Sequence, residues 1–380
     1  MAHFFTVFII VYAVVYSLVH GSLFVGLLGE RARERRLLRA GREVPAVLVS
    51  VIVPVRNEEA LLPLLLSGLK SQTWPDIEYF FVDDGSTDSS VALLEAFKRE
   101  CRFPVCILKA EEPAGGGGFV NRKQQAMGRA IAEARGSILL FTDADCAVGP
   151  DWAGSMARYM SADGTGVVLG PVYKRSAVRG MLYDYQGFDQ VVRGMYVAAS
   201  AGLGAAGGGF GNNIAVRKKA LEEAGGYASI PPTITEDAAM ISLIRKKTRY
   251  TVHAVYDAAV HVHTRCEPTW GKLVNQTLRW HHGGLFSADA VTSLSFGALA
   301  LFYFICALCF PLALIYPPLL IIPAVVFIEN VALNLPAKMY AGKSLPLKLP
   351  QFILYAFIIE YFFTLLTVLC FTAKKPEWKR

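Results

Sequence analysis

The chain has few charged residues for its length of 380, and two long stretches have none. Asp, Glu, Lys and Arg together make up 18% of the residues, whereas 53% are hydrophobic. No such charge occurs in residues 1–29 or in residues 290–328. A membrane-crossing helix needs about 20 consecutive apolar residues. The composition therefore excludes an ordinary soluble protein and predicts membrane segments at both ends.

The apolar run at the start predicts a transmembrane anchor over residues 1–30, followed by a basic juxtamembrane segment over residues 31–43. A cleaved signal peptide would carry its positive charge before the apolar run, whereas here the charge follows it. Six arginines lie between Arg31 and Arg42, which predicts that the next part is cytoplasmic. These arginines either attract anionic lipid headgroups or form a solvated basic helix without lipid contact.

Residues 288–380 predict a C-terminal membrane region with two or three spans. The uncharged run can form a hairpin with its turn at residues 316–318, and a second apolar run follows over residues 351–373. Three spans would leave the basic tail outside, against the charge rule. We therefore favour a re-entrant or interfacial position for one proline-interrupted segment. We expect a multi-pass protein of the inner cell membrane with a cytoplasmic catalytic domain.

Two acidic residues, Glu329 and Glu360, interrupt the C-terminal apolar runs. Ionisable residues inside a membrane are costly and often functional. They either serve such a function or lie near the ends of spans or against a partner helix.

Several absences exclude other classes of site. The seven cysteines form no disulfide or zinc pattern, and the C-x-x-C of Cys306 and Cys309 lies in an apolar run, where both should be buried as small hydrophobes. The net charge of +7 comes largely from residues beside membrane segments, so we expect no nucleic-acid partner. The glycine-rich residues 202–207 do not follow a first strand, and no G-K-[ST] follows residues 114–118, so neither predicts a nucleotide loop.

Residues 44–287 predict one α/β domain. Apolar strand patterns alternate with helical ones, which indicates a mostly parallel sheet. Ligands of such sheets gather at the carboxyl ends of the strands. The predicted strands cover residues 46–55, 77–84, 103–110 and 137–141, and the predicted helices cover residues 56–72, 91–100 and 122–134.

Four carboxylates follow two of these strands: Asp83, Asp84, Asp143 and Asp145. They would repel one another at one sheet edge unless cations or donors lie among them. An Asp-x-Asp pair can bind Mg²⁺ or Mn²⁺, which prefer oxygen ligands and substrate phosphates. Alternatively, Asp143 and Asp145 cap the helix that starts near Asp151.

Seven segments, in order, carry a resemblance to a known family. They are VSVIVPVRNEE, VDDGSTD, RKQQAM, FTDADC, GNNIAVRKKALEEAGGY, TEDAAM and QTLRW. Together they resemble the membrane-bound inverting family-two glycosyltransferases over residues 49–280. The flanking apolar runs are similar to the branch with ceramide glucosyltransferases and cellulose and hyaluronan synthases. The resemblance implies a Rossmann-like fold of the GT-A type that binds a nucleotide sugar, usually a UDP-sugar.

The resemblance also implies roles for the donor-side residues. The base and ribose of the donor would be held by Val55, Glu58, Asp83 and Asp84. Lys123 would neutralise phosphate charge, or it is an exposed helix lysine. Asp145 would be the direct ligand of Mg²⁺ or Mn²⁺, and Asp143 would contact the ribose or support the ion.

On the acceptor side, Glu236 and Asp237 stand at a predicted helix start, where they either cap the helix or act in catalysis. The resemblance implies that Asp237 is the general base, which deprotonates the acceptor hydroxyl. Gln276, Arg279 and Trp280 share one helix face by their spacing. They either form a packed surface or, as the family implies, place Trp280 on the acceptor and the other two near the diphosphate.

One departure from the family concerns Cys146, which stands where some processive members have a histidine ligand. A neutral thiol is a poor ligand for magnesium, and the predicted spans are few for a polymer channel. We therefore expect transfer of one or few sugars to a membrane lipid. A processive polysaccharide synthase and a non-enzymatic nucleotide-sugar-binding membrane module are the alternatives.

Overall fold

The structure is a computed structural model that describes residues 2–40, 47–110, 119–233, 235–342, 345 and 347–372. The chain divides into two compact units, which we describe separately. The sheet unit comprises Gly29–Lys174 and Ala206–Arg265. The membrane unit comprises Met1–Leu28, Arg175–Ala205 and Cys266–Arg380.

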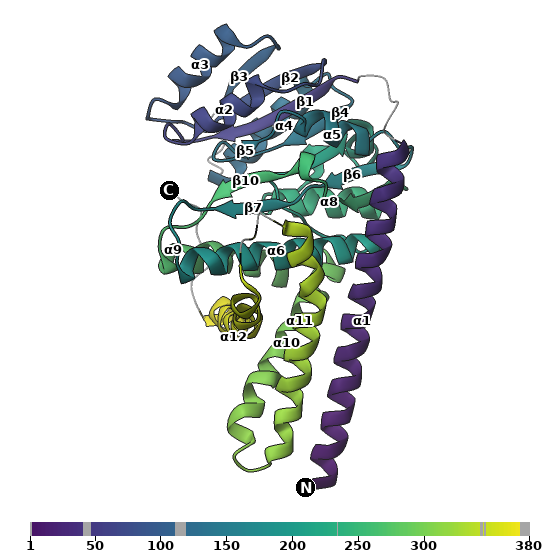
Figure 1. The fold of residues 1–380 in the computed structure, drawn as a ribbon. Helices are drawn as coiled ribbons and strands as arrows, with labels where there is room; N and C mark the ends of the chain where they lie inside the picture. Colours follow the sequence, from purple (N-terminus) through teal and green to yellow (C-terminus); the bar gives the residue numbers. More distant parts are fainter. Residues whose placement is uncertain are drawn as a thin grey trace. The chain divides into compact units, whose positions relative to one another are not determined.

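The sheet unit is built on a seven-stranded sheet with strand order β3-β2-β1-β4-β8-β6-β9 (Figure 1). The strands are β1 (Val49–Val55), β2 (Ile77–Asp83), β3 (Val105–Lys109), β4 (Ile138–Phe141), β6 (Thr165–Leu169), β8 (Ile214–Arg217) and β9 (Thr251–Ala254). Strands β3, β2, β1 and β4 are mutually parallel, whereas β8 runs antiparallel to both β4 and β6. The predicted mostly parallel α/β sheet is therefore confirmed.

Helices and a small second sheet complete this unit. The helices are α2 (Leu62–Lys70), α3 (Ser90–Glu100), α4 (Phe119–Glu133), α5 (Trp152–Tyr159), α7 (Lys218–Glu223) and α8 (Glu236–Lys247). The second sheet has the order β5-β10-β7, with β5 (Ala147–Val148), β10 (Val262–Arg265) and β7 (Val172–Arg175). All seven residues of β2 are buried, as expected for an apolar strand covered on both faces.

The first predicted helix is too long at its start, because residues 56–61 form a loop and α2 begins at Leu62. Asn57 has φ 53°, a left-handed conformation, and its Oδ1 accepts a hydrogen bond from Thr87 N at 2.8 Å. Glu58 N and Glu59 N donate to side chains of the loop after β2. Side chains of this kind compete with helical hydrogen bonds, so the two loops bind each other instead.

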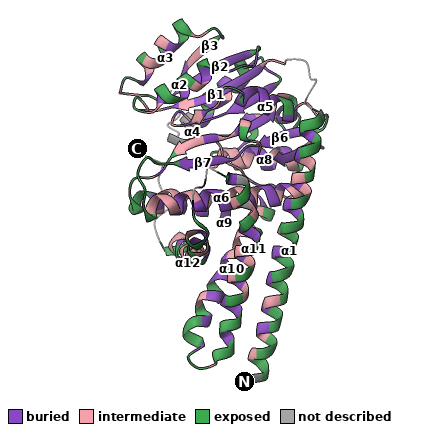
Figure 2. Cartoon of the chain, in the orientation of Figure 1, coloured by how far each residue is buried: buried purple, intermediate pink, exposed green. Residues whose placement is uncertain are grey.

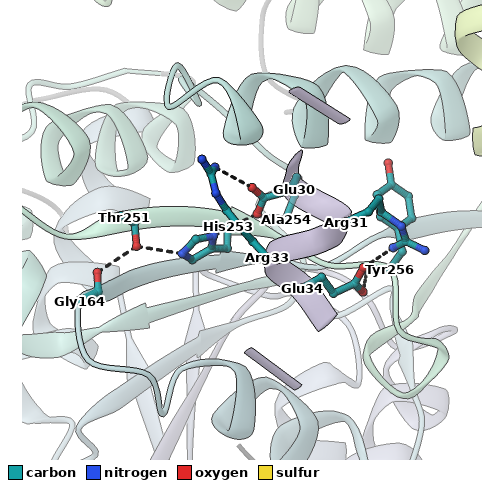
Figure 3. A network of polar contacts seen from close by, with 9 residues as sticks. All are labelled: Glu30, Arg31, Arg33, Glu34, Gly164, Thr251, His253, Ala254 and Tyr256. Atoms are coloured by element: carbon teal, nitrogen blue, oxygen red, sulfur yellow. Dashed lines mark hydrogen bonds and ion pairs between the residues drawn. The ribbon is translucent and has the colours of Figure 1, made fainter. Parts of the chain in front are cut away.

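Helix α1 (Ala2–Ala40) runs through both the predicted anchor and most of the predicted basic segment. Its last turns contact the edge of the large sheet at β9 (Figure 3). Glu30 Oε1 accepts from Ala254 N at 2.9 Å, and Glu34 Oε1 accepts from Tyr256 N at 2.6 Å. A helix rises about 6 Å over four residues, which approximates the distance between alternate residues of a strand. The two carboxylates therefore satisfy successive outward-facing amides.

Two further contacts reinforce this docking. His253 Nδ1 lies 3.1 Å from Glu30 Oε1, and the guanidinium of Arg31 lies over the Tyr256 ring at 4.8 Å from its centroid. Arg33 pairs with Glu30 at 3.2 Å. Arg31 and Arg33 of the basic segment thus contact protein groups.

The membrane unit contains α6 (Met181–Gly202), α9 (Trp270–Leu285), α10 (Ala290–Leu312), α11 (Ile321–Ala341) and α12 (Leu349–Thr372). Among the described residues, four segments are long and apolar enough to cross a membrane: His3–Arg39, Ala290–Leu312, Pro317–Pro336 and Leu349–Thr372. Figure 2 shows many exposed residues along α1, α10 and α11. Helices α10 and α11 are joined by a turn at residues 313–316 and the 3-10 helix η4 (Pro317–Leu320), and the hairpin of two membrane spans stays a prediction.

Buried polar groups join three of these apolar helices. Asn330 Oδ1 of α11 accepts from Tyr16 Oη of α1 at 3.0 Å and from Tyr303 Oη of α10 at 3.3 Å, and His20 Nε2 lies 3.2 Å away. Such hydrogen bonds between helices help to hold transmembrane helices together. Glu329 accepts a hydrogen bond from Ser17, and its functional role stays a prediction.

Two smaller sequence predictions concern the same region. Cys306 and Cys309 are buried in the apolar cluster formed with α1, which confirms their expected role as small hydrophobes. The side chain of Glu360 and the tail beyond residue 372 lie outside the described part of the chain.

Candidate active site

The carboxyl ends of β1 and β2 lie side by side at one edge of the large sheet. Val55 pairs with Asp83 in the parallel register, and Asp84 N donates to the Val55 carbonyl at 2.9 Å. Asp83 and Asp84 are both buried. The sheet therefore brings these three predicted donor-binding residues together.

Local donors compensate the charge of these two carboxylates. Asp83 Oδ1 accepts from Ser86 N at 3.0 Å in the turn after β2, and Asp84 pairs with Arg56 at 3.4 Å. Glu58 is half-buried in the neighbouring loop. Their predicted contacts with the base and ribose stay a prediction.

The Asp-x-Asp segment follows β4 as a turn leading into β5. Asp143 and Asp145 are half-buried. Asp145 Oδ2 accepts from Thr264 Oγ1 of β10 at 3.3 Å, so the small sheet orients this carboxylate. The contact was not predicted, because Thr264 follows Asp145 by more than one hundred residues and carries no local motif.

Cys146 follows Asp145 directly in the sequence and is fully buried. Burial raises the pKa of its thiol well above the ordinary value, and the charges of Asp145 and Asp143 raise it further. The thiol is therefore neutral at physiological pH and unsuited to bind a hard cation.

The donor set at this position fits Mg²⁺ or Mn²⁺ better than a softer metal, because it offers carboxylate oxygens and a protonated thiol. Within the described ranges, no group of three or more His, Cys, Asp or Glu side chains is arranged as a metal site. The pair would therefore need substrate phosphates and water to complete the shell, as is usual for Mg²⁺.

The segment Gly211–Asn213 connects the Asp-x-Asp turn with the predicted catalytic carboxylates. Asn212 Nδ2 donates to Cys146 Sγ at 3.4 Å. A Cβ atom placed on Gly211 would lie only 2.7 Å from Asp237 Oδ2. The backbone at Gly211 thus packs directly against Asp237, and the structure brings Asp145, Cys146 and Asp237 to one place.

Glu236 and Asp237 occupy the first turn of α8, after the N-cap Thr235. Both are half-buried. Burial raises the pKa of the nearby Tyr227 hydroxyl above its ordinary value, and the charges of Glu236 and Asp237 raise it further. Asp237 Oδ1 accepts a hydrogen bond from Ala238 N at 2.8 Å.

Asn213 is a second residue that sequence reasoning missed. It is fully buried, and its Nδ2 donates to the carbonyls of Pro171 at 2.9 Å and Val260 at 2.8 Å. Its Oδ1 accepts from Trp152 Nε1 at 3.0 Å. One amide thereby joins the start of α5, the loop after β6 and the 3-10 helix before β10 to the segment that contacts Asp237.

The remaining predicted residues belong to helices α4 and α9. The side chain of Lys123 lies outside the described residues, although its backbone belongs to α4. Gln276, Arg279 and Trp280 are on α9 of the membrane unit. Gln276 Nε2 donates to Glu267 Oε1 at 3.1 Å.

Burial lowers the pKa of the Arg279 guanidinium, and the charge of Glu267 opposes this effect. Gln276 and Arg279 therefore both lie near Glu267. The Trp280 ring instead contacts Arg193 of α6.

The sheet order and the aspartates at its edge define a GT-A-like fold, the class of nucleotide-sugar-dependent glycosyltransferases. A mannosyltransferase from Pyrobaculum calidifontis, PcManGT, solved in complex with GDP-Man and Mn²⁺, has the same fold with a TM-score of 0.56 and 18% identity. The alignment covers 96% of this chain and 99% of that protein.

The model of the family described as glycosyl transferase family 2 matches residues 50–225, and that of glycosyl transferase family group 2 matches residues 138–372. The second match covers more than half of the chain, so the protein belongs to glycosyl transferase family group 2.

Curated relatives match over parts of their length. A beta-monoglucosyldiacylglycerol synthase from Nostoc sp. is 25% identical over 240 residues, 62% of this chain and 48% of that protein. The corresponding synthase from Synechocystis sp. is 26% identical over 201 residues, 51% of this chain and 39% of that protein. A poly(ribitol-phosphate) beta-glucosyltransferase from Bacillus spizizenii is 35% identical over 105 residues, 27% of this chain and 16% of that protein. The chain thus spans less than half the length of these relatives.

Proposed function

We propose that the protein is a membrane-bound inverting glycosyltransferase that moves a sugar from a nucleoside diphosphate donor, such as a UDP-sugar, to a membrane lipid. The observation that carries this proposal is that the segment Gly211–Asn213 contacts both Cys146, the residue next to Asp145, and Asp237. A donor-side carboxylate and an acceptor-side carboxylate are the two groups that a single displacement needs. A module that only binds nucleotide sugars would have no use for the second.

Asp145 and Asp143 would hold a divalent cation, Mg²⁺ or Mn²⁺, which would supply charge stabilisation to the departing diphosphate. Thr264 orients Asp145, and the neutral thiol of Cys146 leaves coordination to oxygen atoms. Asp83 and Asp84, at the neighbouring strand end, would contact the base and ribose. We retain Lys123 as a candidate for phosphate contact.

Asp237 would accept the proton of the acceptor hydroxyl as that oxygen attacks the anomeric carbon. The contact with the backbone at Gly211 holds its carboxylate in place, and orientation of this kind lowers the entropic part of the barrier. Glu236 would assist through its charge. A single displacement inverts the anomeric centre.

A lipid acceptor is supported by two observations. Four segments of the described chain are apolar enough to cross a membrane, and two relatives matched over more than half of the chain are named as glycosyldiacylglycerol synthases. We further propose a multi-pass protein in the inner membrane with the sheet unit in the cytoplasm. Membership in the branch of the ceramide glucosyltransferases stays a prediction.

The test is release of nucleoside diphosphate by the full chain purified in detergent, across UDP- and GDP-sugars and lipid extracts, with and without chelator. We expect release with one donor and one lipid class, its loss with EDTA, and its recovery with Mn²⁺ or Mg²⁺. Unchanged release in EDTA would contradict the role of Asp145. Product length with a labelled donor separates single transfer from a processive synthase.

The matched variants are Asp237→Asn and, as a control, Glu222→Gln, an exposed carboxylate of α7. We expect Asp237→Asn to lower turnover by about two to four powers of ten, the range of general base catalysis, while donor binding by calorimetry persists. Wild-type turnover in Asp237→Asn would refute the base, and lost donor binding would point to a folding defect instead.

A further inference from the structure

Helix α6 of the membrane unit carries a sequestered ion pair that none of the family motifs includes. Arg193 Nε lies 2.8 Å from Asp189 Oδ2, one helical turn earlier. The side chains are only 19% and 4% exposed, respectively. Burying two charges costs free energy, and the attraction within a well-formed pair does no more than offset that cost. A contribution to stability therefore does not explain why the pair is there.

The guanidinium of Arg193 lies over the indole ring of Trp280, which suggests a role for the pair. The distance from its Cζ to the ring centroid is 5.2 Å. A planar guanidinium over an indole is a favourable cation–π arrangement, and Lys cannot reproduce its stacking. Trp280 ends the QTLRW segment and belongs to α9, so the contact joins two helices of the membrane unit.

Asp189 keeps the guanidinium in this position. Its charge and its hydrogen bond raise the pKa of Arg193 above the ordinary value despite burial. Two consecutive interactions, Asp189 with Arg193 and Arg193 with Trp280, therefore fix the ring from one face. Side chains preorganised in this way lose less entropy when a ligand binds.

We propose that Asp189 and Arg193 are positioning residues that orient Trp280 for an acceptor carrying a sugar or polyol headgroup. This inference rests on the proposed function, in which Trp280 contacts the acceptor. The indole would stack on the apolar face of such a headgroup. Asp189 and Arg193 would act on it only through the ring.

The test is a double-mutant cycle of Arg193→Gln and Trp280→Leu, with KM measured separately for lipid acceptor and sugar donor. We expect Arg193→Gln to raise the acceptor KM by about 2- to 30-fold, the range of a cation–π contact. The donor KM should change less than about twofold. Asp189→Asn should act in the same direction, and Arg193→Lys should give a smaller increase.

The decisive arm is the Trp280→Leu background, in which Arg193→Gln should have almost no further effect on the acceptor KM. An equal effect in both backgrounds, or an equal rise in donor KM, would overturn the inference and assign the pair to general packing. The matched control is Arg179→Gln. It removes the ion pair between Arg179, an exposed residue before α6, and Asp184 in the first turn of that helix, and it should leave both KM values unchanged.

A fluorescence measurement keeps this inference separate from the proposed function. Arg193→Gln should change the tryptophan emission of the full chain in detergent, and the change should vanish in the Trp280→Phe background. If wild type transfers to no acceptor but this signature is present, the proposed function fails and the positioning contact stands. If emission is the same with and without Arg193, the contact itself is refuted.

Discussion

His281, which directly follows the QTLRW segment, should make stability depend on pH in a way that one substitution abolishes. The residue is fully buried on α9, and its ring lies 4.0 Å from that of Phe363 between centroids. Within the described part of the chain, neither ring nitrogen has a hydrogen-bond partner. Burial, reinforced by the charge of Arg193, lowers the pKa of His281 to about 3 from an ordinary 6.5. The folded protein therefore holds this imidazole neutral.

The free energy of unfolding depends on pH because the folded and unfolded chains bind the His281 proton with different affinity. Because the pKa is depressed on folding, the unfolded chain binds the proton first as pH falls below about 6.5. The stabilisation is complete above that pH and declines steadily toward about pH 3. Between about pH 7.5 and pH 5 the loss amounts to about 2 kcal/mol from this group alone.

The assay is equilibrium unfolding in mixed detergent micelles, followed by fluorescence across this pH range, for wild type and His281→Leu. We expect the variant to lack the 2 kcal/mol decline and to be at least as stable at neutral pH, because it removes a buried polar group without partners. Substitution of the exposed His3 by Leu is the control. The same pH slope in wild type and His281→Leu would refute the reasoning.

Three further predictions concern the sheet unit. Asn213→Ala should lower the free energy of unfolding by about 2–5 kcal/mol, as measured by denaturant titration, since it removes three buried hydrogen bonds while the Pro171 carbonyl keeps its bond from Val262 N. A loss below about 1 kcal/mol would contradict the proposed importance of these bonds. Thr264→Val should raise the Mn²⁺ concentration for half-maximal donor hydrolysis about fivefold, as Asp145 loses a hydrogen bond, whereas Thr264→Ser should restore it. Glu30→Ala combined with Glu34→Ala should speed amide hydrogen exchange at Ala254 and Tyr256, because it removes the acceptors of both amides. Unchanged exchange would show that the two carboxylates do not hold this edge.

The sequence was sufficient to predict the alternating strands and helices of the first half of the sheet. Buried parallel strands such as β2 are continuous apolar runs, and their ends are marked by Asp83 and Asp143. The predicted start of α2 was wrong, because side chains around Asn57 bind the loop after β2. That competition depends on two segments thirty residues apart and leaves no periodic signal.

The parts of the candidate site that could not be predicted from the sequence depend on contacts between segments distant in sequence. Asn213 was visible in the GNN segment, but its three partners come from segments far apart in the sequence. Thr264 and Arg193 carry no motif at all, and their importance follows only from what they touch. Polar residues of this kind are ordinary in composition, so spacing cannot single them out.

The docking of Glu30 and Glu34 has a consequence for any shortened form of the protein. An open sheet edge presents unpaired amides that recruit strands from other molecules, and here the last turns of α1 occupy the place such a strand would take. A soluble version that begins after residue 46 would uncover this edge and should self-associate. One that begins at residue 29 keeps both carboxylates and should remain dispersed, so the charged turns that follow the apolar part of α1 protect the protein against aggregation.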